Sequence, residues 1–527
     1  MRRTGKILGW WVTVGLLLCL SGVAWASSPV ERAHRHLTAW QMTEARAAID
    51  SLGQGARVSG QADYLEGRYA FYMGDYEGAL EHLDRALERS DNGQWRSLRE
   101  LVASTLEVTE DYEKHVSPSG RFEIFISPGR DEVLLPYAFE ALEAAYEAFG
   151  EELGYRPEPP VRVEIYPRAT VLAQVSQLTE ENIRTSGTIA LCQHNRLMIT
   201  SPRAVLRGYG WVDTLIHEYV HYVINQATTA NVPIWMHEGL AKYLERRWRG
   251  PDEARLDAAS ERLLRRRMEA GTLIPFDAMH PSMALLPSQE DAAVAFAEVY
   301  TTMEYLRAEV GPGAFAKLLA EINAGHDART AYARVLNTTW REFEDRIWPA
   351  YLRSRPEPGL GDDDEVFEER IVLQEDAGAA GNELEQVEVP EAREHIQLGM
   401  MMQARDRYGA AVVQYQKAAE LLGEHNPVLQ TRLARSLVMS GQADGALEAL
   451  EPLRLLSPGY PTLWVELGRA YLAMNQYGEA REALREAARI NPFNPDVHEK
   501  MARAYRGLNR GEEAEEARRL AALVRGR

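Results

Sequence analysis

Two histidines and a glutamate stand close together in the stretch His217-Glu218-Tyr-Val-His221. If this stretch is helical, residues four apart lie about 40° apart around the axis, so both imidazoles point to the same side. Imidazole is a common ligand of zinc, and two such rings can bind one ion. Glu218 lies about 100° further round, beside such an ion, where its carboxylate can accept a proton. The pattern therefore predicts a metal site with an adjacent base.

A third ligand is expected from the segment Trp235-Met-His-Glu238-Gly-Leu-Ala, which follows Pro233 and predicts a second helix. The stretch of chain between His221 and Glu238 is long enough for a short loop and a return to the same place. Two histidines and one carboxylate leave a fourth coordination position open to water, as catalytic zinc sites do. His237 is the alternative third ligand, and the Glu-Gly-Leu-Ala context favours Glu238.

Together these segments resemble the gluzincin metallopeptidases, in which HExxH is followed by a Trp-x-x-Glu-Gly-Leu-Ala-x-Tyr segment. The likeness is greatest to bacterial peptidase MA-like domains that occur alongside tetratricopeptide (TPR) repeats, and it covers roughly residues 115–352. The resemblance implies that His217, His221 and Glu238 bind Zn²⁺. It also implies that Glu218 polarises the water that attacks a peptide bond.

At one position the sequence departs from this family. In the best-known gluzincins an acidic residue one turn after the ligand glutamate orients a histidine, and that position here is Lys242. Asp213, one turn before His217, could orient an imidazole instead. Some gluzincins use a tyrosine to stabilise the oxyanion, and Tyr300 resembles it because it follows Glu238 at a similar distance along the chain. The alternative for Tyr300 is a side chain packed on a helix face.

The elements that must position these residues begin as strands and continue as helices. Short segments with alternating polar and apolar residues predict strands, and longer periodic segments predict helices. We therefore expect an α+β, gluzincin-like metallopeptidase domain over residues 115–355. In the fold of the resembling family, the strand at 196–200 would be an edge strand that pairs with an extended peptide. Strands are predicted at 121–126, 161–165, 187–191 and 196–200, and helices at 131–153 and from about 211 to 352.

Helical repeats are expected on both sides of this domain. Residues 391–527 repeat with small residues at equivalent positions, which lets paired helices approach closely, as in TPR repeats. Residues 27–112 predict helices with one TPR-like unit. Such repeats imply a surface for a protein partner, and a spacer without a ligand is the alternative. The equivalent residues recur at intervals of about 34 residues, the length of one TPR unit, and they are Gly399, Ala434, Gly468 and Ala502.

Residues 356–390 are rich in acidic residues, glycine and proline, and predict a flexible linker. Few contacts are expected to cross it, so the C-terminal repeats should be separable from the metal-binding domain. Residues 1–26 predict a signal peptide, with a basic start, an apolar run and the cleavage site Ala24-Trp-Ala26. An exported protein, periplasmic or secreted, is therefore expected, without stable membrane insertion after cleavage. An uncleaved membrane anchor is the alternative.

The charge balance bears on possible partners. The chain has 59 Lys and Arg against 78 Asp and Glu, a formal charge of −19, which should repel nucleic acids and anionic lipids. No basic stripe that would overrule this repulsion is evident in the sequence. Cys192 would be alone after cleavage at residue 26, so no intramolecular disulfide is expected, and a buried, unreactive thiol is predicted.

Three kinds of function fit these observations. The first is a zinc-dependent peptidase that acts on a peptide or protein substrate and recruits a partner through its TPR repeats. The second is a catalytically silent scaffold, and the third is a purely structural zinc domain. Because both histidines, Glu218 and Glu238 are all present, the sequence favours the peptidase.

Overall fold

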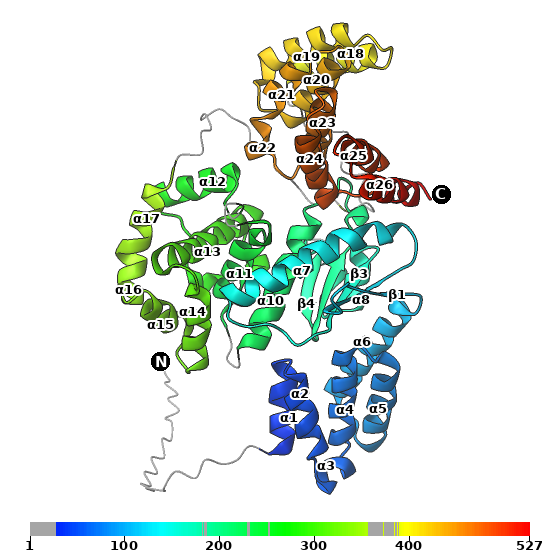
Figure 1. Cartoon of the computed structure of the whole chain (residues 1–527). Helices are drawn as coiled ribbons and strands as arrows, with labels where there is room; N and C mark the ends of the chain where they lie inside the picture. Colours follow the sequence, from blue (N-terminus) through cyan, green and yellow to red (C-terminus); the bar gives the residue numbers. More distant parts are fainter. Residues whose placement is uncertain are drawn as a thin grey trace, which may run out of the picture.

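A computed structural model describes residues 28–526, except for residues 182, 184–186, 229–231, 251, 252, 254 and most of 357–388. The signal segment predicted at 1–26 and most of the linker predicted at 356–390 therefore lie outside the described residues. Figure 1 shows a helical group near the N-terminus, a central group with a sheet, and a helical arm that ends at the C-terminus. In the described part of the chain, no helix combines the length and apolar character needed to cross a membrane.

The N-terminal group consists of short helices that pack in pairs. The closest approach lies where Gly67 faces Leu83, because a Cβ added to Gly67 would lie 2.7 Å from the Leu83 Cγ atom. A larger residue than glycine would push this helix pair apart, so the small residue is a packing requirement. The helices are α1 (Pro29–Thr38), α2 (Met42–Asp50), α3 (Gln54–Val58), α4 (Gln61–Met73), α5 (Tyr76–Arg89) and α6 (Gly93–Thr109).

One sheet forms the centre of the described structure. Its strands are β1 (Glu113–Val116), β2 (Phe122–Ile126), β3 (Val161–Tyr166), β4 (Ala190–Gln193) and β5 (Arg196–Thr200). Their order is β1-β2-β3-β5-β4, with β2, β3 and β5 parallel and the two outer strands antiparallel to their neighbours. The helices α7 (Leu135–Glu152) and α8 (Ala169–Gln174) belong to the connections between these strands.

The prediction that residues 196–200 form an edge strand is wrong. β5 lies between β3 and β4 and is buried along its whole length, as expected of a central parallel strand. The reason is a tight turn at His194 and Asn195, whose φ angles of 55° and 60° return the chain directly alongside β5. The edge strand on this side of the sheet is therefore β4.

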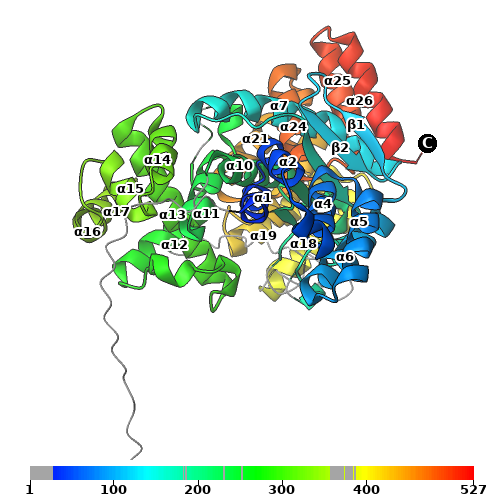
Figure 2. The same ribbon diagram turned by 90° about the horizontal axis from the view of Figure 1, so that it is seen from below.

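The predicted metal ligands lie on two helices that follow the sheet. α10 (Trp211–Ala227) carries His217 and His221, and α11 (Ile234–Leu244) carries Glu238. The helical spacing assumed for the two histidines is thus present, and the ligand carboxylate comes from a neighbouring helix. Both helices lie near the middle of the molecule in Figure 2.

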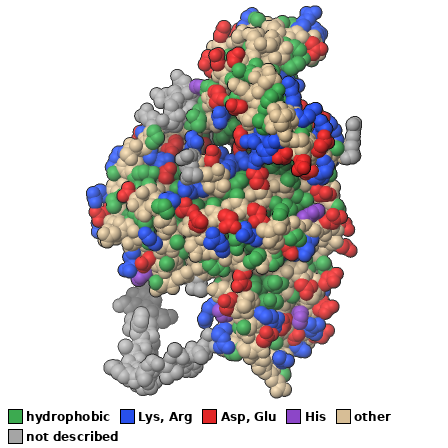
Figure 3. Space-filling model, viewed as in Figure 1, with side chains coloured by type: hydrophobic (Ala, Val, Ile, Leu, Met, Phe, Trp, Pro, Cys, Tyr) green, Lys and Arg blue, Asp and Glu red, His purple; other side chains and the backbone are tan. Residues whose placement is uncertain are grey.

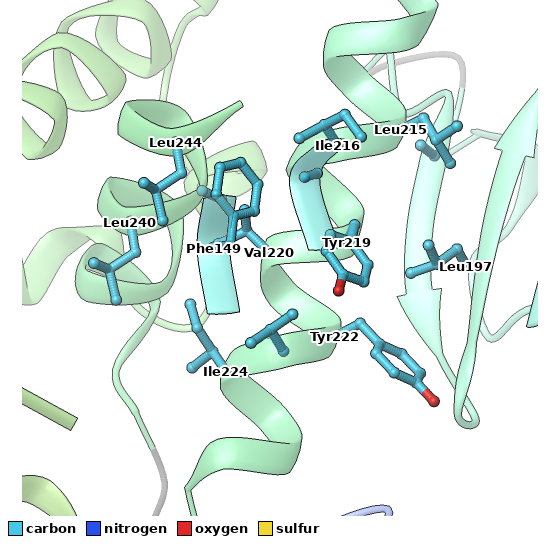
Figure 4. Packing of buried hydrophobic residues seen from close by; sticks show 14 of the residues in the cluster. Phe149, Leu197, Leu215, Ile216, Tyr219, Val220, Tyr222, Ile224, Leu240 and Leu244 are labelled. Atoms are coloured by element: carbon cyan, nitrogen blue, oxygen red, sulfur yellow. The ribbon is translucent and has the colours of Figure 1, made fainter. Parts of the chain in front are cut away.

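Apolar residues hold α10 in place from two sides. Figure 4 shows Leu197 of β5 on one side of α10, and Leu240 and Leu244 of α11 on the other. Along α10 itself, Leu215 and Val220 are fully buried in this core. Because these contacts fix the rotation of α10, the side of the helix that carries the histidines is also fixed.

Helices beyond α11 form a lobe on the side away from the sheet (Figure 2). The longest of them packs along α11 at Gly239, where an added Cβ would lie 2.9 Å from the carbonyl oxygen of Val299. This close approach ties the lobe to the helix that carries Glu238. The helices are α12 (Ala258–Glu269), α13 (Gln289–Val310), α14 (Ala314–Asn323), α15 (Ala328–Val335), α16 (Trp340–Glu342) and α17 (Trp348–Ser354).

The C-terminal arm consists of antiparallel helix pairs stacked on one another. The pairs are α18 (Pro390–Gln403) with α19 (Tyr408–Leu422), α20 (Pro427–Met439) with α21 (Ala443–Leu450), α23 (Pro461–Ala473) with α24 (Tyr477–Ile490), and α25 (Pro495–Gly507) with α26 (Gly511–Val524); α22 (Leu453–Leu456) follows α21. Gly468 shows why small residues recur, because an added Cβ would lie 2.6 Å from the Leu484 Cγ atom.

The arm docks on the central group at the start of α10. The indole Nε1 of Trp211 donates to the carbonyl oxygen of Ala488 at 3.2 Å, and Trp211 is fully buried. The backbone N–H of Tyr209 donates to the carbonyl oxygen of Ile490 at 3.1 Å. The expectation that few contacts connect the arm to the metal-binding domain is therefore wrong, because linker composition says nothing about contacts made elsewhere along the chain.

Charged residues reinforce this junction. Arg249 forms ion pairs with Asp213 of α10 and with Glu486 of α24, the latter at 3.2 Å. Arg485 of α24 pairs with Glu140 of α7. Figure 3 shows basic side chains gathered where the arm meets the rest of the molecule. The arm is thus linked by buried and ionic contacts to the same helix that carries the predicted metal ligands.

A buried polar network joins the N-terminal helices to the sheet. The hydroxyl of Tyr76 in α5 donates to Glu164 of β3 and accepts a hydrogen bond of 2.6 Å from Arg196 of β5. Arg162 lies 2.7 Å from the same carboxylate. Burial alone would raise the pKa of Glu164, but Arg196 and Arg162 lower it to about 2. The carboxylate is therefore charged, and its network fixes where the N-terminal helices sit.

Candidate metal centre

The structure brings His217, His221 and Glu238 together. One ligand atom from each residue lies within 4.8 Å of the other two. The Nε2 atom of His217 is 3.1 Å from the Glu238 Oε2 atom, and the Nε2 atom of His221 is 3.6 Å from it. Both imidazoles therefore present the same nitrogen to the carboxylate, as ligands of a single ion would.

This donor set fits a catalytic zinc site better than a structural one. Two imidazole nitrogens and one carboxylate oxygen are ligands that zinc accepts, and three protein ligands leave a position for water. The side chains of His217, His221 and Glu238 keep 15%, 13% and 21% of their surface exposed. Water can therefore reach the group, whereas a closed structural site is surrounded by four protein ligands.

The electrostatics of the group favour positive charge. Burial would lower the pKa of His217, but its hydrogen bonds to Glu238 and Glu245 raise it to about 10. Burial would raise the pKa of Glu238, but His221 and His217 hold it well below its usual range. The carboxylate is thus ionised, and this part of the structure stabilises a cation.

The outward-facing nitrogen of His217 is held by a residue that the sequence did not single out. The Nδ1 atom of His217 lies 3.1 Å from the Glu245 Oε2 atom, and the other oxygen of Glu245 accepts from Lys242 at 2.6 Å. Such a carboxylate fixes the tautomer and orientation of a ligand histidine. Lys242 therefore does not leave the site without an orienting acid. A sequence signal existed, because Glu245 lies about two helical turns after Glu238.

Two other residues considered from the sequence have different roles. Asp213 pairs with Arg249 and lies 3.6 Å from the Arg246 Nε atom, so its carboxylate is engaged away from the imidazoles. The Nδ1 atom of His237 lies 3.0 Å from the Nδ1 atom of His221, which is the nitrogen that faces away from Glu238. The geometry therefore groups Glu238, and not His237, with the two histidines.

Glu218 lies beside the group, as the spacing predicted. Its side chain is buried and forms no hydrogen bond or ion pair with another described residue. Burial raises the pKa of Glu218, and His221 and His217 partly oppose the shift. Tyr209 and Cys192 are close enough for Glu218 to raise their pKa values further, beyond the effect of burial. A raised pKa and free oxygens suit a carboxylate that accepts and releases a proton.

Tyr300 occupies a different environment from the one implied by the resemblance. It is buried in α13, and its ring packs on Tyr243 with centroids 5.5 Å apart. Its hydroxyl has no hydrogen-bond partner among the described residues. Burial, followed by the nearby Tyr243, raises its pKa. None of the contacts that the structure gives Tyr300 is with the metal-ligand group, so the packed-tyrosine alternative describes its position.

Cys192 lies in β4 and is half-buried. Burial and the carboxylate of Glu218 raise the pKa of its thiol well above the usual value. The thiol is therefore protonated at neutral pH and a poor nucleophile, as predicted.

Comparisons with known families agree with this architecture. Residues 142–353 match the Peptidase MA superfamily, and residues 64–103 and 437–504 match families of tetratricopeptide repeats. The chain therefore contains a Peptidase MA superfamily domain together with TPR repeats on both sides of it. The predicted resemblance and the predicted fold class, an α+β domain flanked by all-α TPR repeats, are confirmed.

Two of the similar solved structures are of TPR proteins. A thermophilic TPR protein of Thermus thermophilus is 24% identical, with a TM-score of 0.24, and the match covers 25% of this chain and 74% of that one. The TPR domain of Sgt2 from Aspergillus fumigatus is 26% identical, with a TM-score of 0.22, covering 24% of this chain and 83% of that one. No curated protein gives a significant match.

Proposed function

We propose that the chain is a zinc-dependent peptidase, with His217, His221 and Glu238 as metal ligands and Glu218 as general base. The observation that carries the proposal is the ligand group itself: three donors within 4.8 Å, open to solvent, with a buried and unpaired carboxylate beside them. Zinc bound by these donors would act as a Lewis acid and make a water molecule a better nucleophile at neutral pH.

Each residue of the site has a specific task in this proposal. Glu218 accepts a proton from the attacking water and delivers it to the leaving amine, which its raised pKa favours. Glu245 holds the Nδ1 atom of His217, so that the Nε2 atom remains directed at Glu238. Tyr300 is not assigned to the oxyanion, because its buried hydroxyl has no contact with the ligand group.

An extended substrate has a suitable neighbour in β4. This strand ends the sheet, and in the described residues its outer side faces no other strand. β4 also packs against α10 and contains Cys192, whose pKa is raised by Glu218. We therefore assign peptide pairing to β4 instead of β5, with backbone hydrogen bonds aligning the substrate beside Glu218.

The decisive experiment compares the wild-type chain with Glu218→Gln, both loaded with the same amount of zinc. The amide cannot accept the proton, so cleavage of a peptide library, read by mass spectrometry, should fall by ~10²–10⁴-fold. Zinc content should stay the same in the variant, since Glu218 is not a ligand. His217→Ala is the matched control, and it should lose the metal together with activity.

The alternative is a silent scaffold whose TPR repeats bind a partner, and the repeats themselves favour protein–protein interaction. A scaffold would show no cleavage in either form and unchanged partner binding in Glu218→Gln. Equal cleavage by the wild type and Glu218→Gln would contradict the mechanism, because it would place the reaction at another site. The presence of an intact Glu218 in a position to act as base favours the peptidase over the scaffold.

Export from the cytoplasm is part of the proposal and rests on residues 1–26 alone. Cleavage after Ala26 would leave Ser27 as the N-terminus. N-terminal sequencing of the protein recovered outside the cytoplasm should begin at Ser27. An intact Met1 on a cytoplasmic form of the protein would contradict the proposed export.

A further inference from the structure

A row of arginines runs along the C-terminal arm. Arg435, Arg469 and Arg503 are separated from one another by one repeat length, and each directly follows one of the small residues of the repeat. They lie on α20, α23 and α25, the first helices of three successive pairs, and α23 packs against both of the others. Equivalent positions on stacked repeats face the same way, so the three guanidinium groups form one row.

Other charged residues of these helices add to the row. Arg432 of α20 and Lys500 of α25 lie one turn before Arg435 and Arg503. Two carboxylates accompany these five cations: Glu466 lies 2.7 Å from the Arg469 Nε atom, and Asp496 lies 3.2 Å from its Nη2 atom. Further carboxylates lie near by but are engaged: Glu499 of α25 pairs with Arg525 of α26, and Asp406 accepts from the Tyr408 hydroxyl.

The two carboxylates neutralise the middle of the row and leave its ends charged. Asp496 pairs with both Arg469 and Lys500. Arg435 is exposed and has no hydrogen-bond or ion-pair partner among the described residues, although it is close enough to Asp496 to help lower the pKa of that carboxyl against the effect of burial. Arg503 is also exposed, and its one side-chain hydrogen bond within the described part of the chain is to the backbone carbonyl of Leu472 at 3.5 Å. Burial lowers the pKa of Lys500, and the nearby Arg469 lowers it further although Asp496 opposes the shift.

We propose that this row binds an extended acidic segment of a partner or substrate protein, with carboxylates on Arg435 and Arg503. Guanidinium groups bind carboxylates through paired, charge-assisted hydrogen bonds, and both groups have donors free for this. Arg435 and Arg503 are exposed cations on one face of an otherwise acidic chain, so an anionic segment of a partner is attracted to them. The row is not evident in the sequence, because it forms only when the repeats stack.

A peptide fits this row better than a nucleic acid. A phosphate backbone carries a charge at every step, and Glu466 and Asp496 would repel it in the middle of the row. An acidic peptide can place its carboxylates at the two ends and neutral residues between them. This inference does not depend on the proposed peptidase activity, because binding by the arm requires neither zinc nor Glu218.

The test uses the full chain with Glu218→Gln, so that a bound peptide is not cleaved. Fluorescence anisotropy would measure binding of a labelled peptide with Asp and Glu separated by Gly and Ser, and of the same peptide with Asn and Gln. The acidic peptide should bind and the neutral peptide should not. Replacing both end arginines (Arg435→Gln with Arg503→Gln) should weaken binding at least tenfold, and binding should weaken as salt increases.

The matched control replaces two exposed arginines outside the row, Arg341→Gln with Arg518→Gln, and changes the net charge equally. It should alter binding less than twofold, while the thermal midpoints of all forms stay alike. Equal weakening in both double variants would overturn the proposal, because the effect would then come from net charge. Absence of binding by the parent chain, or tighter binding of single-stranded RNA than of the acidic peptide, would also overturn it.

Discussion

Glu245 forms a hydrogen bond with His217 and so connects the proposed metal-ligand group to the end of α11. It accepts from Lys242 and holds the Nδ1 atom of His217. Because the carboxylate carries charge, it also makes the imidazole a stronger ligand. Burial alone would favour the neutral form of His217, and the hydrogen bonds to Glu238 and Glu245 oppose this effect.

Replacing this carboxylate should weaken metal binding without removing a ligand. We expect Glu245→Gln to bind zinc ~10–100-fold more weakly than the wild type, as is typical for loss of such a partner. Competition with a chromophoric chelator measures this directly. Tyr300→Phe is the matched control, because it removes a buried hydroxyl without a partner, and it should change neither zinc affinity nor peptide cleavage. A large loss of activity in Tyr300→Phe would restore the catalytic role implied by the resemblance.

Glu298 is a buried acid away from the metal ligands and should make stability depend on pH. Burial raises its pKa to about 8, although a hydrogen bond from the Ile274 backbone N–H opposes the shift. In the unfolded chain a glutamate releases its proton near pH 4.5. Between these values only the unfolded state is deprotonated, so raising the pH from about 4.5 to 8 lowers the free energy of unfolding. The full effect is on the order of 5 kcal/mol.

The neutral variant Glu298→Gln should remove this dependence. Thermal unfolding of the wild type and Glu298→Gln would be compared at pH 5 and pH 9. We expect the variant to gain midpoint temperature relative to the wild type as the pH rises, whatever their order at pH 5. Curves that run parallel over this range would show that Glu298 is not protonated in the folded protein.

At the scale of single residues, short spacings within one helix predicted positions well, whereas a long separation between two residues in the sequence did not. His217, Glu218 and His221 sit on one helix, so helical periodicity was enough to place them. Glu245 could have been found by the same argument, two turns after Glu238. Tyr300 could not be placed, because its long separation from Glu238 in the sequence does not say which side of α13 faces the site.

Between elements, the contact of α11 with α13 controls the position of Glu238. Gly239, the next residue, has no room for a side chain: an added Cβ would lie 2.9 Å from the Val299 carbonyl oxygen and 3.1 Å from the Met303 Cγ atom. The backbone oxygen cannot rotate away as a side chain can. An alanine here must therefore push the two helices apart and move Glu238 with them.

We expect Gly239→Ala to destabilise the fold by ~1–3 kcal/mol and to weaken zinc binding. Gly478→Ala is the matched control, because Gly478 is also helical but has no atom within 4 Å of an added Cβ. There the alanine should stabilise by up to ~1 kcal/mol, since it removes freedom from the unfolded chain. Chemical denaturation of both variants gives the two free energies. Changes of the same sign would contradict the packing argument.

The strands show what sequence patterns leave undecided. Alternation placed β2 and β3 closely, because their apolar residues repeat with period two, and β5 was placed by its short run of consecutive apolar residues. It could not give their order in the sheet, which depends on pairing between distant segments. β1 has an exposed pattern without a clear apolar face, so it was missed. The position of β4 followed from the turn at His194 and Asn195, whose positive φ angles the sequence suggested only weakly.

On the scale of the whole molecule, the composition of the linker predicted few contacts between the C-terminal arm and the central domain. The contacts between the arm and α10 contradict this prediction. The arm covers Trp211, the first residue of α10, and Arg249 pairs with both Asp213 and Glu486. Asp213 lies one turn before His217, so the arm supports the helix that carries two of the proposed metal ligands. Partner binding at the arginine row would therefore act on a body that is packed against the metal-binding domain.

The docking of the C-terminal arm on α10 predicts slow hydrogen exchange at the Tyr209 amide. The backbone N–H of Tyr209 donates to the carbonyl oxygen of Ile490, so its hydrogen exchange reports directly on the arm. A chain that ends at Arg355 should exchange this amide much faster, as measured by mass spectrometry of a peptide spanning 205–216. It should also lose roughly 3 kcal/mol of stability from exposure of Trp211 and its neighbours. For a domain of this size, that corresponds to a midpoint lower by roughly 6–12 °C.

Point variants separate docking from the general effect of shortening the chain. Glu486→Ala removes the ion pair with Arg249 and should increase exchange at Tyr209 while the arm stays folded. Glu482→Ala, on the same helix α24, removes only an exposed pair with Arg481 and should leave exchange unchanged. If the shortened chain and Glu486→Ala both exchange as slowly as the wild type, the start of α10 is protected without the arm. In that case the arm would be the separable module that the linker suggested, and its contacts would not support the metal-binding helix.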